Sequence, residues 1–359
     1  MNNKINKLSQ TFLLNCNYTG RNRMSSNPVI RRAVSADYTD LMDIGDVYGG
    51  IDYFMALYHD FLDDPDIYPV VAEVKCRAIG FSMNHIIDGG LTVSRRAGRV
   101  HNSHRGAGIM HLMTQELERH QRENYPGVKY LAWCARRSAA EKAGRDMRDN
   151  GYEKVILKPT LGFIFDVKKI KCHLKPEITS QVLSMTYDDL NHLFGVGDVV
   201  DALFPKKRLF NFYKPFRCME ANIKHVISER HDVFATTSAP TAQISEGQGH
   251  FTEEMLRDID MVSFSERFPV RHGLVYTLDL YGRDQVGDVT IRSHLQRHVG
   301  SLETLTQDGG TLVITYGNNI EGERVFSILR ELGVDELSPV VDSWKVLYEK
   351  CVDTHSASS

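Results

Sequence analysis

The chain of 359 residues lacks three features that mark common classes of protein. Its 43 Lys and Arg residues are balanced by 46 Asp and Glu residues, so it has no excess of the positive charge typical of nucleic-acid-binding proteins. No segment approaches the roughly 18 consecutive apolar residues that a membrane-spanning helix requires. The six cysteines are scattered and form no Cys-x-x-Cys pair, which favours reduced thiols over a disulfide framework. These absences argue against a nucleic-acid-binding protein and exclude a transmembrane one.

The composition is that of an ordinary globular protein, with 42% hydrophobic and 25% charged residues. The length predicts about two domains. Residues 1–28 are rich in Asn and Ser and contain no apolar run long enough for a signal peptide, so we expect a disordered leader on a cytoplasmic protein. We also expect a flexible tail over residues 353–359.

Residues 29–170 alternate between strand and helix patterns, which predicts one α/β domain. Strands are expected over residues 29–33, 70–74, 78–83, 91–100, 128–134, 152–158 and 163–167. Helices are expected from a cap at Ser35 to about residue 46, over residues 51–62, from residue 109 onward, and over residues 138–149 up to a stop at Asn150-Gly151.

A second α/β unit follows over residues 171–352. Its expected helices cover residues 187–203, 289–305 and 321–332, its expected strands cover residues 275–280, 312–316 and 344–348, and residues 236–249 form a polar surface loop. From residue 275 onward, the order of strands and helices repeats that of residues 91–158. We interpret this repeat as a diverged internal duplication.

The segment from Val100 to Ile109 is a polar loop that follows a predicted strand and opens a predicted helix. Gly106 and Gly108 allow backbone N–H groups to turn toward one point, the helix N-terminus adds partial positive charge there, and Arg105 supplies a further cation. This combination predicts a site for a phosphate or pyrophosphate. The loop lacks the Gly-Lys-Ser/Thr of a Walker loop and the third glycine of a dinucleotide fingerprint.

The same loop resembles the acetyl-CoA loop of the GCN5-related N-acetyltransferase superfamily. Arg105-Gly106-Ala107-Gly108 matches the superfamily pattern R/Q-x-x-G-x-G/A, with Met110 where glycine or alanine is usual. The resemblance implies the superfamily's mixed-sheet fold over residues 29–170 and acetyl-CoA as co-substrate. The residues that it implies for acetyl-CoA binding are Val100, His101, Arg105, Gly106, Ala107, Gly108 and Ile109.

A closer resemblance is to the vertebrate histidine N-acetyltransferase group. It is carried by Tyr48-Gly49-Gly50-Ile51-Asp52-Tyr53, by Asp64-Pro65-Asp66 and, in the second half, by Pro215-Phe216-Arg217 and His272-Gly273. The group implies acetyl transfer to the α-amino group of free histidine, with Tyr48, Asp52 and Tyr53 in the acceptor pocket. Taken alone, the two glycines at 49 and 50 indicate only a turn between two helices.

Such a transfer is a direct attack by a neutral amine on a thioester. It needs two oriented substrates, a proton acceptor and a hydrogen-bond donor for the developing oxyanion. The family resemblance implies that the strand before the loop and the strand over residues 128–134 splay apart around the pantetheine. Backbone groups near Val100 and His101 would then hold the thioester.

The catalytic side chain stays unassigned. Residues 91–99 contain no acid and residues 138–149 no tyrosine, which leaves His85, Asp88 and a water chain as alternatives. An amino-acid acceptor also carries a carboxylate, so its pocket should contain a cation. The candidates on the strand before the loop are Arg95, Arg96 and Arg99.

Two further features argue against additional ligands. His101 and His104 have no cysteine or carboxylate that would complete a zinc site, so we expect no metal. In the second unit, the corresponding loop runs from Tyr281 to Asp288, its glycines are five residues apart, and its two aspartates would repel a pyrophosphate. We therefore predict a degenerate acetyltransferase-like domain without a cofactor.

The sequence thus predicts a cytoplasmic, acetyl-CoA-dependent N-acetyltransferase with a mixed-sheet α/β catalytic domain and a second, degenerate one. The expected acceptor is a small-molecule amine or amino acid, histidine by resemblance, and neither nucleic acid nor membrane. Two alternatives stay open: acetylation of another small amine or a protein N-terminus, and a catalytically inactive acetyl-CoA-binding scaffold. The oligomeric state is left open.

Overall fold

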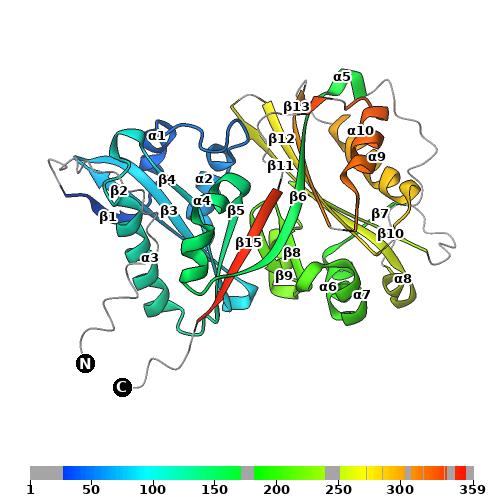
Figure 1. Ribbon diagram of the computed structural model, residues 1–359, viewed down its shortest axis with the longest axis horizontal. Helices are drawn as coiled ribbons and strands as arrows, with labels where there is room; N and C mark the ends of the chain where they lie inside the picture. Colours follow the sequence, from blue (N-terminus) through cyan, green and yellow to red (C-terminus); the bar gives the residue numbers. More distant parts are fainter. Residues whose placement is uncertain are drawn as a thin grey trace. The chain divides into compact units, whose positions relative to one another are not determined.

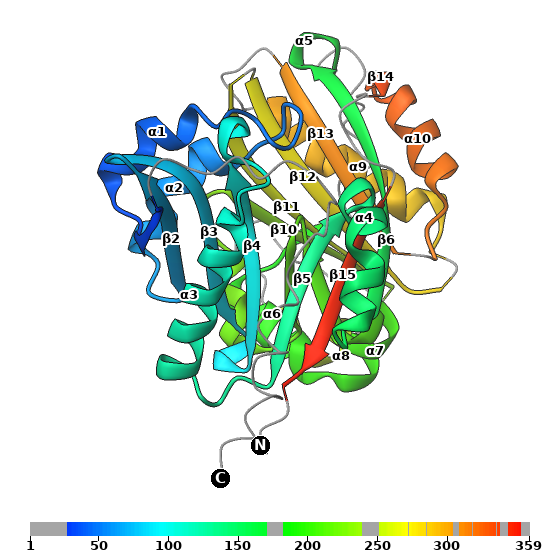
Figure 2. The same cartoon turned by 60° about the vertical axis from the view of Figure 1, so that its left-hand side comes forward.

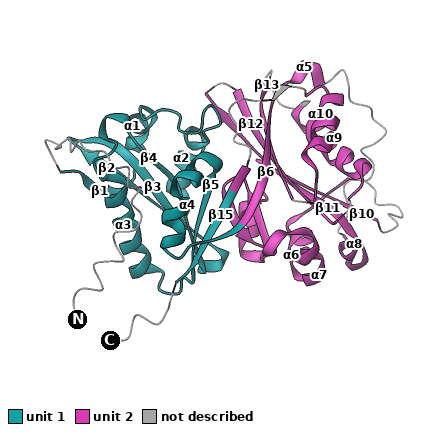
Figure 3. Cartoon of the chain, viewed as in Figure 1, with its two compact units in different colours: residues 1–155, 346–359 teal, residues 156–345 magenta. Residues whose placement is uncertain are grey.

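The computed structural model describes residues 27–170, 182–238, 251–271, 273–284, 286–303, 309–317, 319–334, 336–337 and 344–352. The chain divides into two compact units (Figure 3), one formed by residues 1–155 and 346–359 and the other by residues 156–345. The sequence had suggested a boundary near residue 170 instead. Nearly all of the predicted leader, the whole predicted tail, His272 and most of the predicted loop over residues 236–249 lie outside the described residues.

The described residues of the first unit form a mixed sheet and four α-helices, which Figure 1 labels. Its strands are β1 (Val29–Arg32), β2 (Ile67–Val74), β3 (Arg77–Ile87), β4 (Thr92–Val100), β5 (Tyr130–Arg136) and the end of β15 (Trp344–Cys351). Its helices are α1 (Tyr38–Met42), α2 (Phe54–Asp63), α3 (Ile109–Asn124) and α4 (Arg137–Asp149). The strand order is β1-β2-β3-β4-β5-β15, antiparallel from β1 to β4 and parallel between β4 and β5.

The two faces of this sheet carry different helices (Figure 2). Gly80 of β3 faces α3, because a Cβ at this position would lie 3.2 Å from a methyl group of Ile109. The next residue, Phe81, packs its ring against Phe54 of α2, with the centroids 4.7 Å apart. Successive side chains of a strand point to opposite faces. The sheet therefore has an α3 face and an α2 face.

Most predicted elements of this unit form where expected, and one difference has a clear local cause. The helix start assigned to Ser35 depends instead on Asp37, whose carboxylate accepts a hydrogen bond from a backbone N–H three residues earlier (2.9 Å). Arg31 holds the same carboxylate through two hydrogen bonds of 2.6 and 2.8 Å. Gly151 ends α4 in a left-handed conformation (φ 77°), as predicted.

The second unit contains its own mixed sheet, a two-stranded ribbon and six helices among its described residues. Its strands are β6 (Glu153–Asp166), which begins in the first unit, β7 (Leu183–Ser184), β8 (Arg208–Asn211), β9 (Lys214–Arg217), β10 (His231–Thr237), β11 (Ile259–Val270), β12 (Gly273–Gly282), β13 (Gly309–Tyr316) and β14 (Glu336–Leu337). Its helices are α5 (Val167–Ile170), α6 (Tyr187–Gly195), α7 (Gly197–Leu203), α8 (Glu253–Arg257), α9 (Asp288–Glu303) and α10 (Gly322–Glu331).

Three predictions for this half of the chain were wrong in detail. The single helix expected over residues 187–203 is broken at Val196, whose ψ of 88° is not helical, into α6 and α7. The two strands expected on either side of Pro159 form the single strand β6, whose pairing with β13 begins only at Thr160 and so needs no N–H from the proline. Strands β10 and β11 had not been predicted.

The two units share one topology. In the second unit, β7, β10, β11 and β12 are antiparallel neighbours, and β12 is parallel to β13. The same sequence of pairings joins β1 to β5 in the first unit. In both units a long helix connects the two parallel strands, and a second helix ends at a glycine with positive φ, Gly151 or Gly333. This correspondence supports the interpretation of an internal duplication.

The described cysteines Cys76, Cys134, Cys218 and Cys351 are free thiols. Among the helices of the described residues, none combines the length and the apolar character needed to cross a membrane.

A chain of buried hydrogen bonds lies in the core of the second unit. Ser263 Oγ is 2.7 Å from both His294 Nδ1 and His298 Nε2. Tyr276 OH is 2.8 Å from His298 Nδ1 and donates a hydrogen bond to Asp232. Because a carboxylate only accepts, Tyr276 must accept from His298 Nδ1–H, and the Nε2 atom of that ring accepts from Ser263. Ser263 in turn accepts from His294. Burial lowers the pKa of both rings and so favours their neutral forms.

We predict that these two histidines make the protein sensitive to acid. Burial lowers the pKa of His294 to about 3 and that of His298 well below its ordinary value. Both rings gain a proton on unfolding below about pH 6.5, so their contribution is complete above that pH. It decreases toward pH 3 by about 1.4 kcal/mol per pH unit for each histidine.

Urea unfolding between about pH 7 and pH 5 tests this prediction. The variant His294→Gln should lose less stability over that range than the wild type. The variant His192→Gln, at an exposed position, should behave as the wild type does. Equal pH slopes in all three proteins would contradict the account.

Candidate active site

Strands β4 and β5 pair along only part of their length. Their parallel register ends with Arg95 opposite Trp133, although β4 continues to Val100 and β5 to Arg136. Beyond this point the facing backbone groups of the two strands are not paired with each other. We call these residues, 96–100 of β4 and 134–136 of β5, the β4–β5 divergence. The family resemblance implied such a splay.

A β-bulge accompanies the divergence. Met83 of β3 pairs with Arg96 of β4, whereas Phe81 pairs with Arg99, so the register shifts between them. Ala97 lies in this bulge with φ of +57°. Bulges bend a strand and increase its twist, which accounts for the separation of β4 from β5. The sequence gives no signal for the bulge, because alanine does not favour positive φ.

The predicted anion-binding loop connects β4 directly to α3. Gly106 and Gly108 both have φ of +78°, which glycine adopts without strain. A Cβ at either position would meet nothing within 4 Å, so the requirement for glycine is conformational rather than steric. No described side chain caps α3 at Gly108. The N–H groups of its first turn have no partner within the helix and point toward any anion bound there.

Hydrogen bonds within the loop fix its shape. Arg105 Nε donates to the carbonyl oxygen of Val100 (3.1 Å), and its two terminal amino groups bond to no described residue. The backbone N–H of His101 donates to a carbonyl oxygen of β3 (2.8 Å), which continues the edge of β4. Ser103 Oγ lies 2.7 Å from His101 Nδ1 and 2.8 Å from His104 Nδ1. Both imidazoles therefore use Nδ1 inside the loop.

Apolar side chains anchor the start of α3 to the sheet. Ile109 and Met113 are buried against β2 and β3, and Ala107 packs on the same cluster. Met110, which stands where the family pattern has a small residue, lies over Gly98 of β4, where a Cβ would come within 3.2 Å of its methyl group. The Met110 side chain therefore fits over β4 because Gly98 has no side chain.

Asp52 holds the segment before α2 onto β4. It accepts two hydrogen bonds from Arg99, from Nη1 (2.9 Å) and from Nη2 (3.1 Å). It also accepts from the backbone N–H groups of Val47 (3.3 Å) and Phe54 (3.0 Å). These four bonds match the acceptor capacity of a carboxylate. Asp52 therefore positions its neighbours, and its four acceptor sites are filled by protein groups. The sequence had placed it in the acceptor pocket.

The other two predicted acceptor residues lie at the divergence. Tyr48 and Tyr53 have ring centroids 5.5 Å apart. The guanidinium of Arg136, at the end of β5, is 5.9 Å from the centroid of the Tyr48 ring. The guanidinium of Arg96, on β4, is 5.7 Å from that of Tyr53. The structure thus brings both tyrosines to the unpaired parts of β4 and β5. Nothing in the sequence had singled out Arg136.

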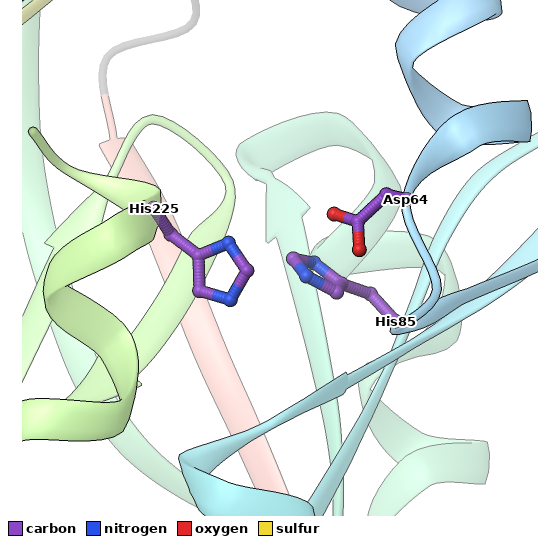
Figure 4. Close-up of side chains that lie close together, drawn as sticks. All are labelled: Asp64, His85 and His225. Atoms are coloured by element: carbon purple, nitrogen blue, oxygen red, sulfur yellow. The ribbon is translucent and has the colours of Figure 1, made fainter. Parts of the chain in front are cut away.

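The candidate bases on β3 and before β4 are both engaged. Arg96 Nη1 lies 3.2 Å from His85 Nδ1. Because arginine only donates, His85 Nδ1 accepts, and the proton of the neutral ring is on Nε2. Figure 4 shows the carboxylate of Asp64, which follows α2, turned toward this ring. Asp88 accepts a hydrogen bond from Thr92 Oγ1 (2.5 Å) in the turn that leads into β4.

The second unit differs at the corresponding strands. Strands β12 and β13 pair without interruption, with residues 274–280 opposite residues 310–316. At the start of α9, Asp288 forms an ion pair with Arg324, which also donates to the carbonyl oxygen of Val286 (2.7 Å). In the described part of this unit, the parallel strands therefore show no divergence, and a carboxylate occupies the helix start.

We predict that removing Asp52 destabilises the first unit. The side chain of Arg99 is 1% exposed and that of Asp52 11%. Asp52→Ala would leave a buried guanidinium without its counter-charge, which costs about 3–5 kcal/mol of unfolding free energy. The double variant Asp52→Ala/Arg99→Met should lose less, because no charge is left buried.

Urea unfolding measures these changes, and the exposed ion pair of Arg137 and Glu141 provides the control. Glu141→Ala should cost at most about 1 kcal/mol. A loss for Asp52→Ala that is no larger than this would show that the buried ion pair does not hold the segment.

Comparison with protein families supports the resemblance to histidine N-acetyltransferases. The family model described as "Histidine N-acetyltransferase, C-terminal" matches residues 178–307, which belong to the second unit. The histidine N-acetyltransferase of Oreochromis niloticus is 21% identical over 289 residues, covering 76% of this chain and 80% of that protein. The histidine N-acetyltransferase of Scomber australasicus is 19% identical over 283 residues, with 76% and 80% covered.

Solved structures share the fold. A GCN5-related N-acetyltransferase from Sphaerobacter thermophilus aligns with a TM-score of 0.50 at 14% identity, covering 92% of this chain and 97% of that chain. A tandem GNAT protein from the clavulanic acid biosynthesis pathway aligns with a TM-score of 0.50 at 9% identity, covering 90% and 98%. The fold class expected from the sequence is thus confirmed. The chain has the fold of the GCN5-related N-acetyltransferases, and its sequence resembles the histidine N-acetyltransferase group.

Proposed function

We propose that this protein transfers an acetyl group from acetyl-CoA to the α-amino group of a free amino acid, histidine being the favoured acceptor. The β4–β5 divergence carries this proposal, together with the glycine loop that connects β4 to the uncapped N-terminus of α3. It combines unpaired backbone groups for a thioester with a site for a pyrophosphate at one end of β4. Histidine rests on the sequence resemblance.

The loop residues would bind the pyrophosphate of acetyl-CoA. Gly106 and Gly108 give the loop its left-handed turns, Ala107 and Ile109 fasten it to the core, and Arg105 keeps its terminal amino groups for the phosphates. The backbone of Val100 and His101 would lie beside the pantetheine. Acetyl-CoA supplies the activated acetyl group, and the protein supplies orientation.

The chemistry needs little from side chains. A backbone N–H in the divergent part of β4 would donate to the oxyanion that forms during attack. His85 and Asp88 already hold hydrogen-bond partners, which favours water as the carrier of the proton released by the amine. Tyr48 and Tyr53 would provide aromatic surface for the acceptor.

The loop assignment predicts that acetyl-CoA binding depends on Gly108 and Arg105. Gly108→Val forces a branched side chain into left-handed conformation, at about 1–2 kcal/mol, which a folded domain tolerates. It also redirects the N–H groups that would contact the pyrophosphate. Arg105→Glu places a negative charge beside that group. Both variants should lose measurable acetyl-CoA binding by calorimetry and still unfold cooperatively.

Gly333→Val, at a glycine of the second unit that also has a left-handed φ (83°), is the matched control. It should bind acetyl-CoA as the wild type does. Unchanged affinity in the Gly108 and Arg105 variants would refute the loop assignment.

A second prediction concerns the acceptor. Purified protein with acetyl-CoA should release coenzyme A rapidly when histidine is added from a panel of the twenty amino acids and several polyamines. Thiol release is followed with a chromogenic reagent. If only another amine supports release, histidine is not the acceptor, but the assignment as an acetyltransferase stands. If no small amine supports release, the assignment as an amino-acid acetyltransferase is wrong.

A further inference from the structure

The three arginines of β4 have different surroundings. Arg95 lies on the α3 face, where its Nη2 is 3.6 Å from Glu118. Arg99 is bound on both terminal nitrogens by Asp52. Each of these two guanidinium groups therefore has a carboxylate of the protein within 4 Å.

Arg96 has no such partner. It is only 8% exposed, and no carboxylate of the described residues lies within ion-pair distance of it. Of its five N–H donors, one is engaged with neutral His85, and its buried Nε has no hydrogen-bond partner. The rings of Tyr53 and Phe61 lie 5.7 and 6.0 Å from the guanidinium carbon. These contacts leave a buried positive charge without a counter-ion.

Ser94 repeats this pattern on the same face of the strand. It precedes Arg96 by two residues, so both side chains point to the α2 face. Ser94 is fully buried, and its Oγ has no hydrogen-bond partner among the described residues. Buried donors and charges without partners destabilise a protein by several kcal/mol. Two of them side by side on one strand indicate a place for a ligand that accepts hydrogen bonds and carries negative charge.

We propose that Arg96, assisted by Ser94, binds the α-carboxylate of the amino-acid acceptor. This inference rests on the proposed function. One guanidinium matches the single charge of a carboxylate, and its Nε edge suits a planar, two-oxygen acceptor. Arg96 is also the first residue of β4 beyond the last pair with β5. In an α-amino acid, the amine is one carbon away from the carboxylate. A carboxylate held by Arg96 therefore keeps the attacking nitrogen close to the divergence.

The test compares histidine with histamine, which lacks only the carboxylate. In the wild type, kcat/KM for histidine should exceed that for histamine by about 10–100-fold, the range of a charge-assisted hydrogen-bonded pair. Arg96→Gln should remove most of this preference by raising KM for histidine, with little change for histamine. Arg96→Lys keeps the charge but lacks the planar guanidinium, so its preference for histidine should lie between those of the wild type and Arg96→Gln.

Arg95→Gln is the matched control, because it changes a neighbouring arginine on the opposite face. It should keep the preference for histidine, even if it lowers thermal stability. Calorimetry measures the binding of histidine and of histamine in the presence of coenzyme A without any turnover. Arg96→Gln should weaken the binding of histidine and leave that of histamine unchanged.

The outcomes separate the two proposals. If histidine and histamine bind and react equally well in the wild type, or if Arg96→Gln weakens both to the same extent, Arg96 does not read the carboxylate, and acetyl transfer still stands. If no amine supports thiol release and neither compound binds, the proposed function and this inference both fail.

Discussion

The register between β4 and β5 determines what the first unit can do. A parallel pair normally satisfies its backbone groups along its whole length, but here the pairing ends at Arg95 and Trp133, where the bulge at Ala97 bends β4 away. This bend leaves backbone N–H and C=O groups of β4 unpaired with β5, and the proposed chemistry uses these groups to hold the thioester. In the second unit, the same topology keeps its two parallel strands fully paired. One fold thus gives an open strand edge in one copy and a closed one in the other.

Charge placement on β4 complements this backbone geometry. Arg99 and Asp52 fasten the segment that carries Tyr48 and Tyr53, and the stacking of Arg99 on Phe54, 3.7 Å from the ring centroid, adds to the same attachment. Arg96 remains as a buried cation beside Tyr53. The ion pair therefore stabilises the wall of the site, whereas the unpaired cation is available to a ligand. Both arginines lie on the α2 face, and they differ in their partners: Asp52 binds Arg99, whereas aromatic rings and His85 surround Arg96.

Sequence patterns predicted the fold of the first unit well because its elements have strong local signals. Gly151 was expected to end a helix in left-handed conformation, and Gly106 and Gly108 were expected to turn the loop; all three have positive φ. The amphipathic pattern from Ile109 likewise predicted α3. The bulge at Ala97 and the unbroken strand through Pro159 were not predicted, since both depend on pairing with distant strands. The partner of Asp52 and the surroundings of Arg96 were not predicted either, because they depend on contacts between β4 and segments distant in sequence.

The central claim is that acetyl-CoA binds along the end of β4 and the start of α3, and at no corresponding place in the second unit. Amide hydrogen exchange with and without acetyl-CoA tests this most directly, because it reports each backbone N–H separately. Bound acetyl-CoA should slow exchange only over residues 97–110 and at the end of β5. Residues 283–290, at the start of α9, should exchange at the same rate in both conditions. Protection at the start of α9, or none in the loop, would contradict the claim.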